Sequence, residues 1–254
     1  MSLSLKDQIV IVSGAGRGLG AAIATAFARE GATVAVNYRA SRKTAEALAA
    51  KLGDHAKAFQ ADIRDLEDTK RLVFEVTEHF GAPTTIIHNA LADFSFNGDA
   101  RSKLDALSWT EMTRQLETAL QGALNLIQAA RPAMAQAGFG RIVTIGTNLF
   151  QNPVVPYHDY TAAKAALLSL TRTAAAELGP LGITVNMVSG GLLRTTDASS
   201  ATPEAVFDII AANTPLRRVT TPHEVADAVL FFASPWARAV TGQNLIVDGG
   251  LVFG

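Results

Sequence analysis

The sequence contains no cysteine among its 254 residues. A chain without cysteine forms no disulfide, no thiolate metal site and no cysteine nucleophile, and it gives no indication of a redox compartment. No run of about 18 apolar residues occurs, which is roughly what a membrane-spanning helix needs. The N-terminus also lacks a basic segment followed by an apolar one. We therefore expect a soluble cytoplasmic protein.

Neither sign of charge is in excess. The chain has 22 lysines and arginines against 23 acidic residues, for a formal net charge of −1. This balance argues against nucleic acid as a main partner. With 48% hydrophobic residues, the length suits one large α/β domain or two small ones. No repeat or linker divides the sequence, so we expect a single domain over residues 1–254.

A glycine-rich segment follows the first apolar run. The β-branched run Gln8–Val12 predicts a buried strand, and a helical pattern covers 21–29. Between them lie Gly14, Gly18 and Gly20. A strand, a glycine loop and a helix in this order are typical of a dinucleotide site, where the pyrophosphate binds at the helix N-terminus. A tight turn with nothing bound is the alternative, and the flanking elements favour the nucleotide.

The second strand, expected over 33–38, bears on the choice of nicotinamide cofactor. A site for NAD usually has an acidic residue about 20 residues after the glycines. Here Asn37 and Tyr38 occupy this position, Arg39 follows, and Arg17 lies inside the glycine loop. Two guanidinium groups without a carboxylate suit a 2′-phosphate, so we predict that NADP(H) is preferred over NAD(H). The alternative is that both arginines are solvated surface residues.

Helical and strand patterns alternate along the rest of the chain. Further helices are expected over 41–52, 66–80, 109–137, 159–178 and 222–233, and further strands over 56–61, 84–88, 141–147, 183–188 and 243–247. This alternation predicts a Rossmann-like, doubly wound parallel sheet in three α/β/α layers. Capping boxes that begin at Ser108 and Thr221 mark two helix starts.

Irregular segments leave the carboxyl edge of the predicted sheet, where ligands bind in open α/β folds. They cover residues 91–107, 148–158 and 191–219. Phe94 and Phe96 either line a substrate pocket or pack the first segment down. In the third segment, Thr202 and Pro203 predict the N-cap and first residue of a short helix. That segment is either a mobile lid or an ordinary surface loop.

Tyr160 and Lys164 are four residues apart in a predicted helix, which places them on one face, one turn apart. An ammonium beside a phenol favours the phenolate, so we expect Lys164 to lower the pKa of Tyr160. Such a phenol is a general acid/base. Thr147, at the end of a predicted strand, is placed to hold a substrate oxygen. For the spacing alone, an exposed pair without a role is the alternative.

In this order the motifs resemble the short-chain dehydrogenase/reductase family over essentially the whole chain, and the 3-oxoacyl-[acyl-carrier-protein] reductases in particular. The matching residues are Gly14, Gly18, Gly20, Asp62, Asn89, Ala90, Tyr160, Lys164 and the ending at 241–250. The resemblance implies NADPH-dependent reduction of a carbonyl, with a 3-oxoacyl thioester or a similar lipophilic ketone as substrate. It also implies a homotetramer, or a homodimer, joined partly by the helices at 109–137 and 159–178.

The resemblance also implies roles for individual residues. Tyr160 would be the acid/base, Lys164 would lower its pKa and hold the nicotinamide ribose, and Thr147 would orient the substrate oxygen. After the third strand, Asp62 would either accept from the adenine amino group or cap the next helix. Expected cofactor contacts are Gly14, Arg17, Gly18, Leu19, Gly20, Tyr38, Arg39, Asp62, Ile63, Asn89, Ala90, Tyr160, Lys164, Gly191, Leu193 and Thr195. No metal is expected.

Four positions depart from the family pattern. Thr147 replaces the usual serine, Leu91 replaces a glycine, and Gly190 replaces a proline. Ala119 stands where the family has a catalytic asparagine that supports a proton relay through water. Gln115, Gln121 and Asn125 are candidates to compensate. The alternatives to a carbonyl reductase are therefore an NADP-dependent alcohol or sugar dehydrogenase, and a weakly active cofactor-binding protein; the intact Tyr160 and Lys164 favour an enzyme.

Overall fold

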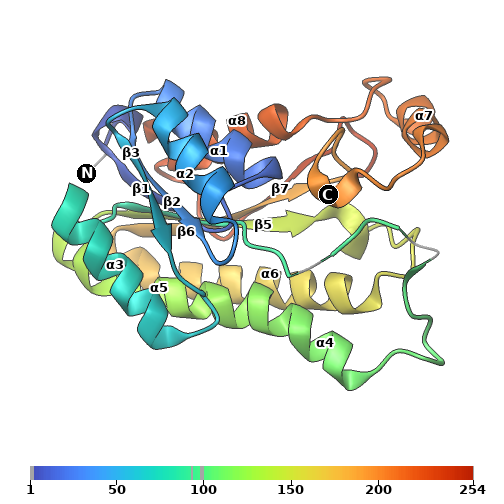
Figure 1. Ribbon diagram of the computed structural model, residues 1–254, viewed down its shortest axis with the longest axis horizontal. Helices are drawn as coiled ribbons and strands as arrows, with labels where there is room; N and C mark the ends of the chain where they lie inside the picture. Colours follow the sequence, from blue (N-terminus) through green and yellow to red (C-terminus); the bar gives the residue numbers. More distant parts are fainter. Residues whose placement is uncertain (1–2, 93, 98–99, 254) are drawn as a thin grey trace.

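A computed structural model describes residues 3–92, 94–97 and 100–253. Seven parallel strands form one sheet in the order β3-β2-β1-β4-β5-β6-β7 (Figure 1). This confirms the Rossmann-like fold predicted from the sequence. The strands are β1 Ile9–Val12, β2 Thr33–Tyr38, β3 Ala56–Gln60, β4 Thr85–His88, β5 Gly140–Thr147, β6 Ile183–Gly190 and β7 Asn244–Val247.

Helices cover both faces of the sheet, with α1, α2 and α8 on one side and α3, α4, α5 and α6 on the other (Figure 1). Their bounds are α1 Gly18–Arg29, α2 Arg42–Leu52, α3 Leu66–Phe80, α4 Trp109–Leu116, α5 Gly122–Ala137, α6 His158–Leu178, α7 Glu204–Asn213 and α8 Pro222–Ala233. Among the described residues, no helix has the length and apolar character needed to cross a membrane.

Two apolar cores lie on the two faces of the sheet. Phe27 of α1 and Val229 of α8 belong to one core, and Leu72 of α3 and Leu126 of α5 belong to the other. Side chains alternate between the faces of a strand, so neighbouring residues of β1 serve different cores: Val10 joins the first and Ile11 the second. Strands buried on both sides explain the continuous β-branched runs of the sequence.

The order of strands reverses beside β1. Val12 pairs with Val36 of β2 on one side and with Ile87 of β4 on the other. The connections from these two neighbours therefore leave in opposite directions, which opens a crevice at the carboxyl ends of the strands. The segment with Gly14 and Gly18 lies at this crevice, directly after β1.

Two of the predicted helix starts are confirmed, and at two others a different residue is the N-cap. Ser108 and Thr221 form the expected capping boxes with Glu111 and Glu224. By contrast, Asp62 does not cap α3, because Asp65 accepts the hydrogen bond from Asp68 N instead. In the third loop, Pro203 is the N-cap of α7, and the Thr202 hydroxyl donates to a carbonyl in another segment.

The predicted long helix at 109–137 is interrupted. A π-helical turn at Glu117–Gln121 separates α4 from α5. Such a turn has hydrogen bonds from residue i to i+5 and holds one residue more than an α-turn. The sequence predicts a continuous helix here because no proline marks a boundary within this turn. The turn contains Ala119, the position of the missing asparagine.

Candidate active site

The glycine loop after β1 has a geometry that side chains would obstruct. Gly14 and Gly18 have positive φ angles of 62° and 55°, which favour glycine. A Cβ on Gly20 would lie 2.3 Å from the Gly14 carbonyl oxygen. The Asn89 amide donates to the carbonyls of Ser13 and Gly14, over 3.1 and 3.2 Å. At these glycines the loop backbone is thus open, it is held by Asn89 at the N-terminus of α1, and it fits a pyrophosphate.

A short segment of the third loop closes over this cradle. A Cβ on Gly18 would point at the Thr196 side chain, 3.6 Å away. The Arg17 guanidinium lies 3.4 Å from the Asp197 carboxylate. Arg17 therefore faces this third-loop segment across the glycine loop, and it does not line the pocket that contains Arg39.

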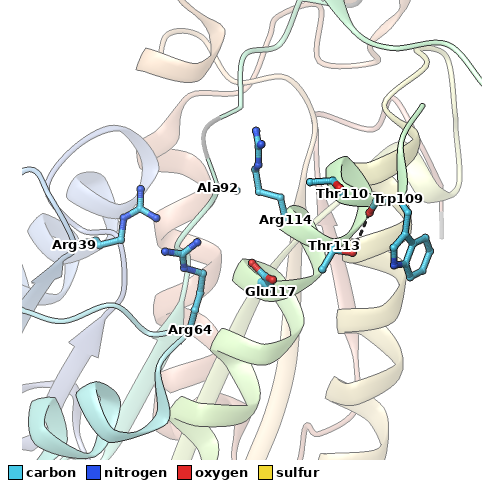
Figure 2. Close-up of a pocket in the computed structure, with 8 residues that line it drawn as sticks. All are labelled: Arg39, Arg64, Ala92, Trp109, Thr110, Thr113, Arg114 and Glu117. Atoms are coloured by element: carbon cyan, nitrogen blue, oxygen red, sulfur yellow. Dashed lines mark hydrogen bonds between the residues drawn. The ribbon is translucent and has the colours of Figure 1, made fainter. Parts of the chain in front are cut away.

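A pocket of about 390 Å³ lies beside the ends of β2 and β3. Its lining residues are Arg39, Arg64, Ala92, Trp109, Thr110, Thr113, Arg114 and Glu117. Figure 2 shows Arg39 and Arg64 next to each other on one side, with the residues of α4 on the other. We call this the cationic pocket, because three guanidinium groups face one carboxylate, that of Glu117. Such a charge excess suits a phosphate.

Asp62 is engaged by Arg64 in this structure. The Arg64 Nε lies 2.9 and 3.1 Å from the two carboxylate oxygens, and a second guanidinium nitrogen approaches to 2.5 Å. This hydrogen-bonded pairing lowers the pKa of the Asp62 carboxyl below its ordinary value. Arg64 was not singled out by the sequence analysis, although an arginine two residues after the strand-end aspartate was a signal for it.

The three proposed catalytic residues come together at the carboxyl end of β5. Thr147 ends β5, and Tyr160 and Lys164 lie one turn apart in α6. The side chains of all three are buried. The Tyr160 hydroxyl shares a hydrogen bond with Thr147. The Lys164 ammonium lies 5.8 Å from the centre of the Tyr160 ring and donates to the Ile145 carbonyl over 2.6 Å.

The pKa of Tyr160 departs from the sequence-based expectation. Burial raises it to about 12, and the hydrogen bond with Thr147 opposes this rise. Burial also lowers the pKa of Lys164 to about 8. The predicted lowering of the Tyr160 pKa by Lys164 is therefore not found in the chain without a cofactor. The reason is desolvation, which disfavours the charged form of both groups.

His88 is a buried residue at this site that the sequence analysis missed. It ends β4, and its Nε2 lies 2.9 Å from the Ala119 carbonyl in the π-helical turn. Its Nδ1 lies 3.5 Å from the Ser13 hydroxyl. Burial and the nearby charge of Lys164 lower the pKa of His88 to about 3. A neutral imidazole thus joins β4 to the turn that lacks the asparagine. A histidine within an otherwise apolar strand was the signal.

Phe94 and Phe96 lie against the proposed acid/base. Their ring centres are 4.7 and 5.7 Å from that of Tyr160. Of the two alternatives left open by the sequence, these contacts favour the lining of a substrate site.

Several of the other predicted cofactor residues are packed inward. Tyr38, Ile63 and Leu193 have buried side chains that belong to the apolar cores. Any contact they make with a cofactor therefore comes from the backbone or a side-chain edge. Gly191 and Thr195 lie in the third loop, which begins directly after β6.

Comparisons with known proteins agree with this geometry. Residues 14–252 match the family described as Enoyl-(Acyl carrier protein) reductase. The 3-oxoacyl-[acyl-carrier-protein] reductase FabG of Staphylococcus aureus is 32% identical over 244 residues, which cover 95% of this chain and 96% of the relative. Nodulation protein G of Azospirillum brasilense is also 32% identical, with 98% and 100% covered.

A crystal structure of a dehydrogenase/reductase from Sinorhizobium meliloti 1021 superposes with a TM-score of 0.86 at 30% sequence identity. The alignment covers 99% of this chain and 97% of that one. The family match, the relatives and the fold agree over nearly the whole length. The chain therefore belongs to the short-chain dehydrogenase/reductase family of oxidoreductases, whose members use NAD(P)(H).

Proposed function

We propose that this oxidoreductase reduces a carbonyl to an alcohol with NADPH, and that its substrate is a 3-oxoacyl thioester or a similar lipophilic ketone. The observation that carries the proposal is the buried group of Thr147, Tyr160 and Lys164 beside the glycine loop. When bound there, a reduced nicotinamide supplies a hydride for the carbonyl carbon. The glycine loop and Asn89 would hold the cofactor, and Tyr160 would give a proton to the carbonyl oxygen.

The protonation state of Tyr160 is compatible with a role as the proton donor of a reductase. With a pKa of about 12, the phenol carries its proton at neutral pH. This is the form that donates to a carbonyl oxygen, whereas alcohol oxidation needs the phenolate as a base. After proton donation, the charge on Tyr160 would be balanced by the Lys164 ammonium, which is largely protonated below its own pKa of about 8. Thr147 would orient the carbonyl oxygen.

A preference for NADP(H) is supported by the cationic pocket. Arg39 follows β2 directly, and Arg64 and Arg114 line the same space. Guanidinium groups make strong bidentate hydrogen bonds to phosphate. The residue after β2 is Arg39 and not the carboxylate that would bind the ribose hydroxyls of NAD(H). We propose that Arg39 binds the 2′-phosphate, with Arg114 adding positive charge around it, whereas Arg64 is paired with Asp62.

A lipophilic substrate is supported by a second cleft, beside the start of α6. It has a volume of about 430 Å³ and is lined by Pro153, Val154, Val155, Pro156, Tyr157, His158, Thr161 and Ala162. Most of these side chains are apolar, and Thr161 follows Tyr160 directly in α6. An acyl chain or another apolar group attached to the substrate carbonyl would contact these side chains. The FabG relatives are named for 3-oxoacyl substrates.

We also propose a homotetramer. Leu124 on α5 and Phe231 on α8 are apolar and 41% and 37% exposed. Their helices lie on opposite faces of the sheet (Figure 1), which would allow two separate contacts with other copies. Sedimentation equilibrium tests this proposal, and a monomer would contradict it.

The proposed reaction is tested by NADPH consumption with acetoacetyl thioester and a panel of simple ketones, wild type beside Tyr160→Phe. The variant is expected to lose at least about 100-fold in kcat, the low end of what general acid catalysis contributes. Its NADPH dissociation constant and circular dichroism spectrum should stay close to those of the wild type. A Phe variant that turns over like the wild type would contradict the role of Tyr160.

The same panel separates the alternatives. If the wild type binds NADPH but reduces none of the ketones, alcohols and sugars with NADP⁺ are tested next, as substrates of a dehydrogenase. Failure of both sets would leave a cofactor-binding protein with little chemistry. That outcome is the one that Ala119 favours, because an alanine side chain cannot hydrogen-bond to a relay water.

A further inference from the structure

Two aromatic rings, Phe94 and Phe96, contact the ring of Tyr160, and Tyr157 contacts both of them. We call Phe94, Phe96 and Tyr157 the aromatic cover. Phe94 lies nearly parallel to Tyr160, at 31° and 4.7 Å between ring centres, and Phe96 meets it edge-on at 86° and 5.7 Å. Tyr157 contacts Phe94 at 5.2 Å and Phe96 at 5.9 Å. The ring of Tyr160 therefore has one aromatic face and one aromatic edge packed against it.

The position of Phe94 is fixed through Asp159, the residue before Tyr160. The Arg101 guanidinium pairs with the Asp159 carboxylate, and both side chains are largely buried. The same guanidinium lies 4.4 Å from the centre of the Phe94 ring, within cation–π range. One cation thus joins Phe94 to the N-terminal turn of α6, so Phe94 is held against the residue that we propose as the acid.

Phe96 is joined to the third loop. Its backbone N–H donates to the Ala198 carbonyl over 2.9 Å, and its carbonyl accepts from the Thr202 hydroxyl over 3.1 Å. These two bonds hold the backbone, whereas the ring is positioned by its contacts with the other rings. The Thr202 hydroxyl thus holds the Phe96 backbone and does not cap α7.

The aromatic cover is not a part of the apolar cores. Among the described residues, the three buried apolar clusters contain none of Phe94, Phe96, Tyr157 and Tyr160. Phe94 and Phe96 are only half buried, although Tyr157 and Tyr160 are buried. Rings that served only to fill a core would be covered on all sides. Here two of them keep an open edge, at the carboxyl end of the sheet where ligands bind.

We propose that the aromatic cover selects carbonyl compounds whose carbonyl is attached to a planar, unsaturated ring, and that Phe94 is the main specificity-determining residue. The inference rests on the proposed reductase function and names its substrate class. Aromatic pairs gain from offset-stacked and edge-to-face geometry beyond the area that they bury, so a planar ring gains more here than a saturated group of the same size. Phe94 and Phe96 pack against Tyr160 in these two geometries, and the exposed parts of their half-buried rings are the surface that a substrate ring would contact.

The test compares two β-keto esters that differ only in the ring, ethyl benzoylacetate and its cyclohexyl analogue. Conjugation changes the intrinsic reactivity of the phenyl compound, so the quantity compared is the phenyl-to-cyclohexyl ratio of kcat/KM in wild type and Phe94→Leu. We expect the ratio to fall by about three- to tenfold in the variant, the contribution of one aromatic pair. Phe74→Leu on α3, which is exposed and remote from the site, is the matched control and should leave the ratio unchanged.

A second measurement is independent of turnover. Calorimetry in the presence of NADP⁺ gives the dissociation constants of benzamide and cyclohexanecarboxamide, which are not reduced. The wild type is expected to bind benzamide several-fold more tightly, and Phe94→Leu to lose this difference. Equal ratios in wild type and Phe94→Leu, by either measurement, would overturn the inference. If neither ester is reduced although NADPH binds, the proposed function fails for these ketones, while the calorimetry still decides whether the aromatic cover selects planar rings.

Discussion

The glycine loop and the aromatic cover meet at the same edge of one sheet, and they are held in different ways. The glycine loop is held at its backbone atoms: Ala15 N–H donates to the Asn37 carbonyl over 2.9 Å, and the Asn89 side-chain amide donates to the carbonyls of Ser13 and Gly14. The rings of the aromatic cover are held by contacts with other side chains, which are the neighbouring rings and the pair of Arg101 with Asp159.

This difference separates what the two regions tolerate. The cofactor side depends on the glycines of the loop, so an added Cβ would clash with backbone atoms that cannot move away. The substrate side works because particular rings are present, so an exchange of one ring changes contacts and leaves the backbone in place. Substitutions at the glycine loop should therefore affect folding and cofactor binding, and substitutions in the cover should affect the choice of substrate.

The largest effect is expected from Gly20→Ala. A variant as stable as the wild type would contradict the proposed difference between the two regions. The new Cβ would meet the Gly14 oxygen at 2.3 Å and the Asn89 amide nitrogen at 2.5 Å. We expect the free energy of unfolding in urea to fall by about 1–3 kcal/mol, as for overpacking elsewhere, with weaker NADPH binding. Gly179→Ala is the matched control, because a Cβ there has nothing within 4 Å and φ is −51°.

His88, between the two regions, should make stability depend on pH. Its pKa is about 3 in the folded chain, against an ordinary value of 6.5. Below pH 6.5 the unfolded chain takes up a proton that the folded chain refuses, so unfolding becomes easier as pH falls toward 3. The contribution is about 1.4 kcal/mol per pH unit. Urea titrations of wild type and His88→Gln at several pH values should show a shallower dependence in the variant, and the exposed His223→Gln should not; parallel curves for all three would contradict the assignment.

Arg39→Ala tests the proposed binding of the 2′-phosphate. Losing one charged hydrogen-bonding group should raise the NADPH dissociation constant about tenfold, with little change for NADH, because NADH has no 2′-phosphate. Fluorescence titration with both cofactors measures this. Arg172→Ala, an exposed arginine on α6, is the control. Tighter binding of NADH than NADPH by the wild type would disprove the preference for NADP(H).

The smallest effect is expected from Ala119→Asn. It returns a hydrogen-bonding side chain to the π-helical turn, where the backbone carbonyl is already bonded by His88. We expect a gain of a few-fold in kcat, with KM for the ketone unchanged, if proton resupply limits turnover. An unchanged kcat would mean that position 119 does not limit the rate.

The sequence predicted the fold and the course of the glycine loop better than the side-chain contacts around them. Gly14, Gly18 and Gly20 carry their meaning locally, because a glycine loop between a strand and a helix has few other uses. Tyr160 and Lys164 are set by helical spacing alone. These features depend on neighbours in the chain, which a sequence displays directly.

The features that the sequence did not predict depend on contacts between distant segments. His88 bonds a carbonyl 31 residues away. The rise in the pKa of Tyr160 comes from burial, which spacing to Lys164 does not reveal. Thr202 bonds Phe96 across 106 residues instead of capping a helix. The partners of these side chains cannot be read from their neighbours in the sequence.

The π-helical turn at Glu117–Gln121 also sets the rotational phase of α5. Each residue of an α-helix turns the chain by about 100°, so one extra residue in a turn rotates the whole downstream helix by that angle. Before the turn, α4 packs against α6; after it, α5 packs against α3 and the sheet, where Asn125 donates to the Ile63 carbonyl over 2.8 Å. The single additional residue thus lets α4 and α5 turn different sides toward their two neighbours. The direction in which each apolar side chain from Gly122 to Ala137 faces depends on this residue.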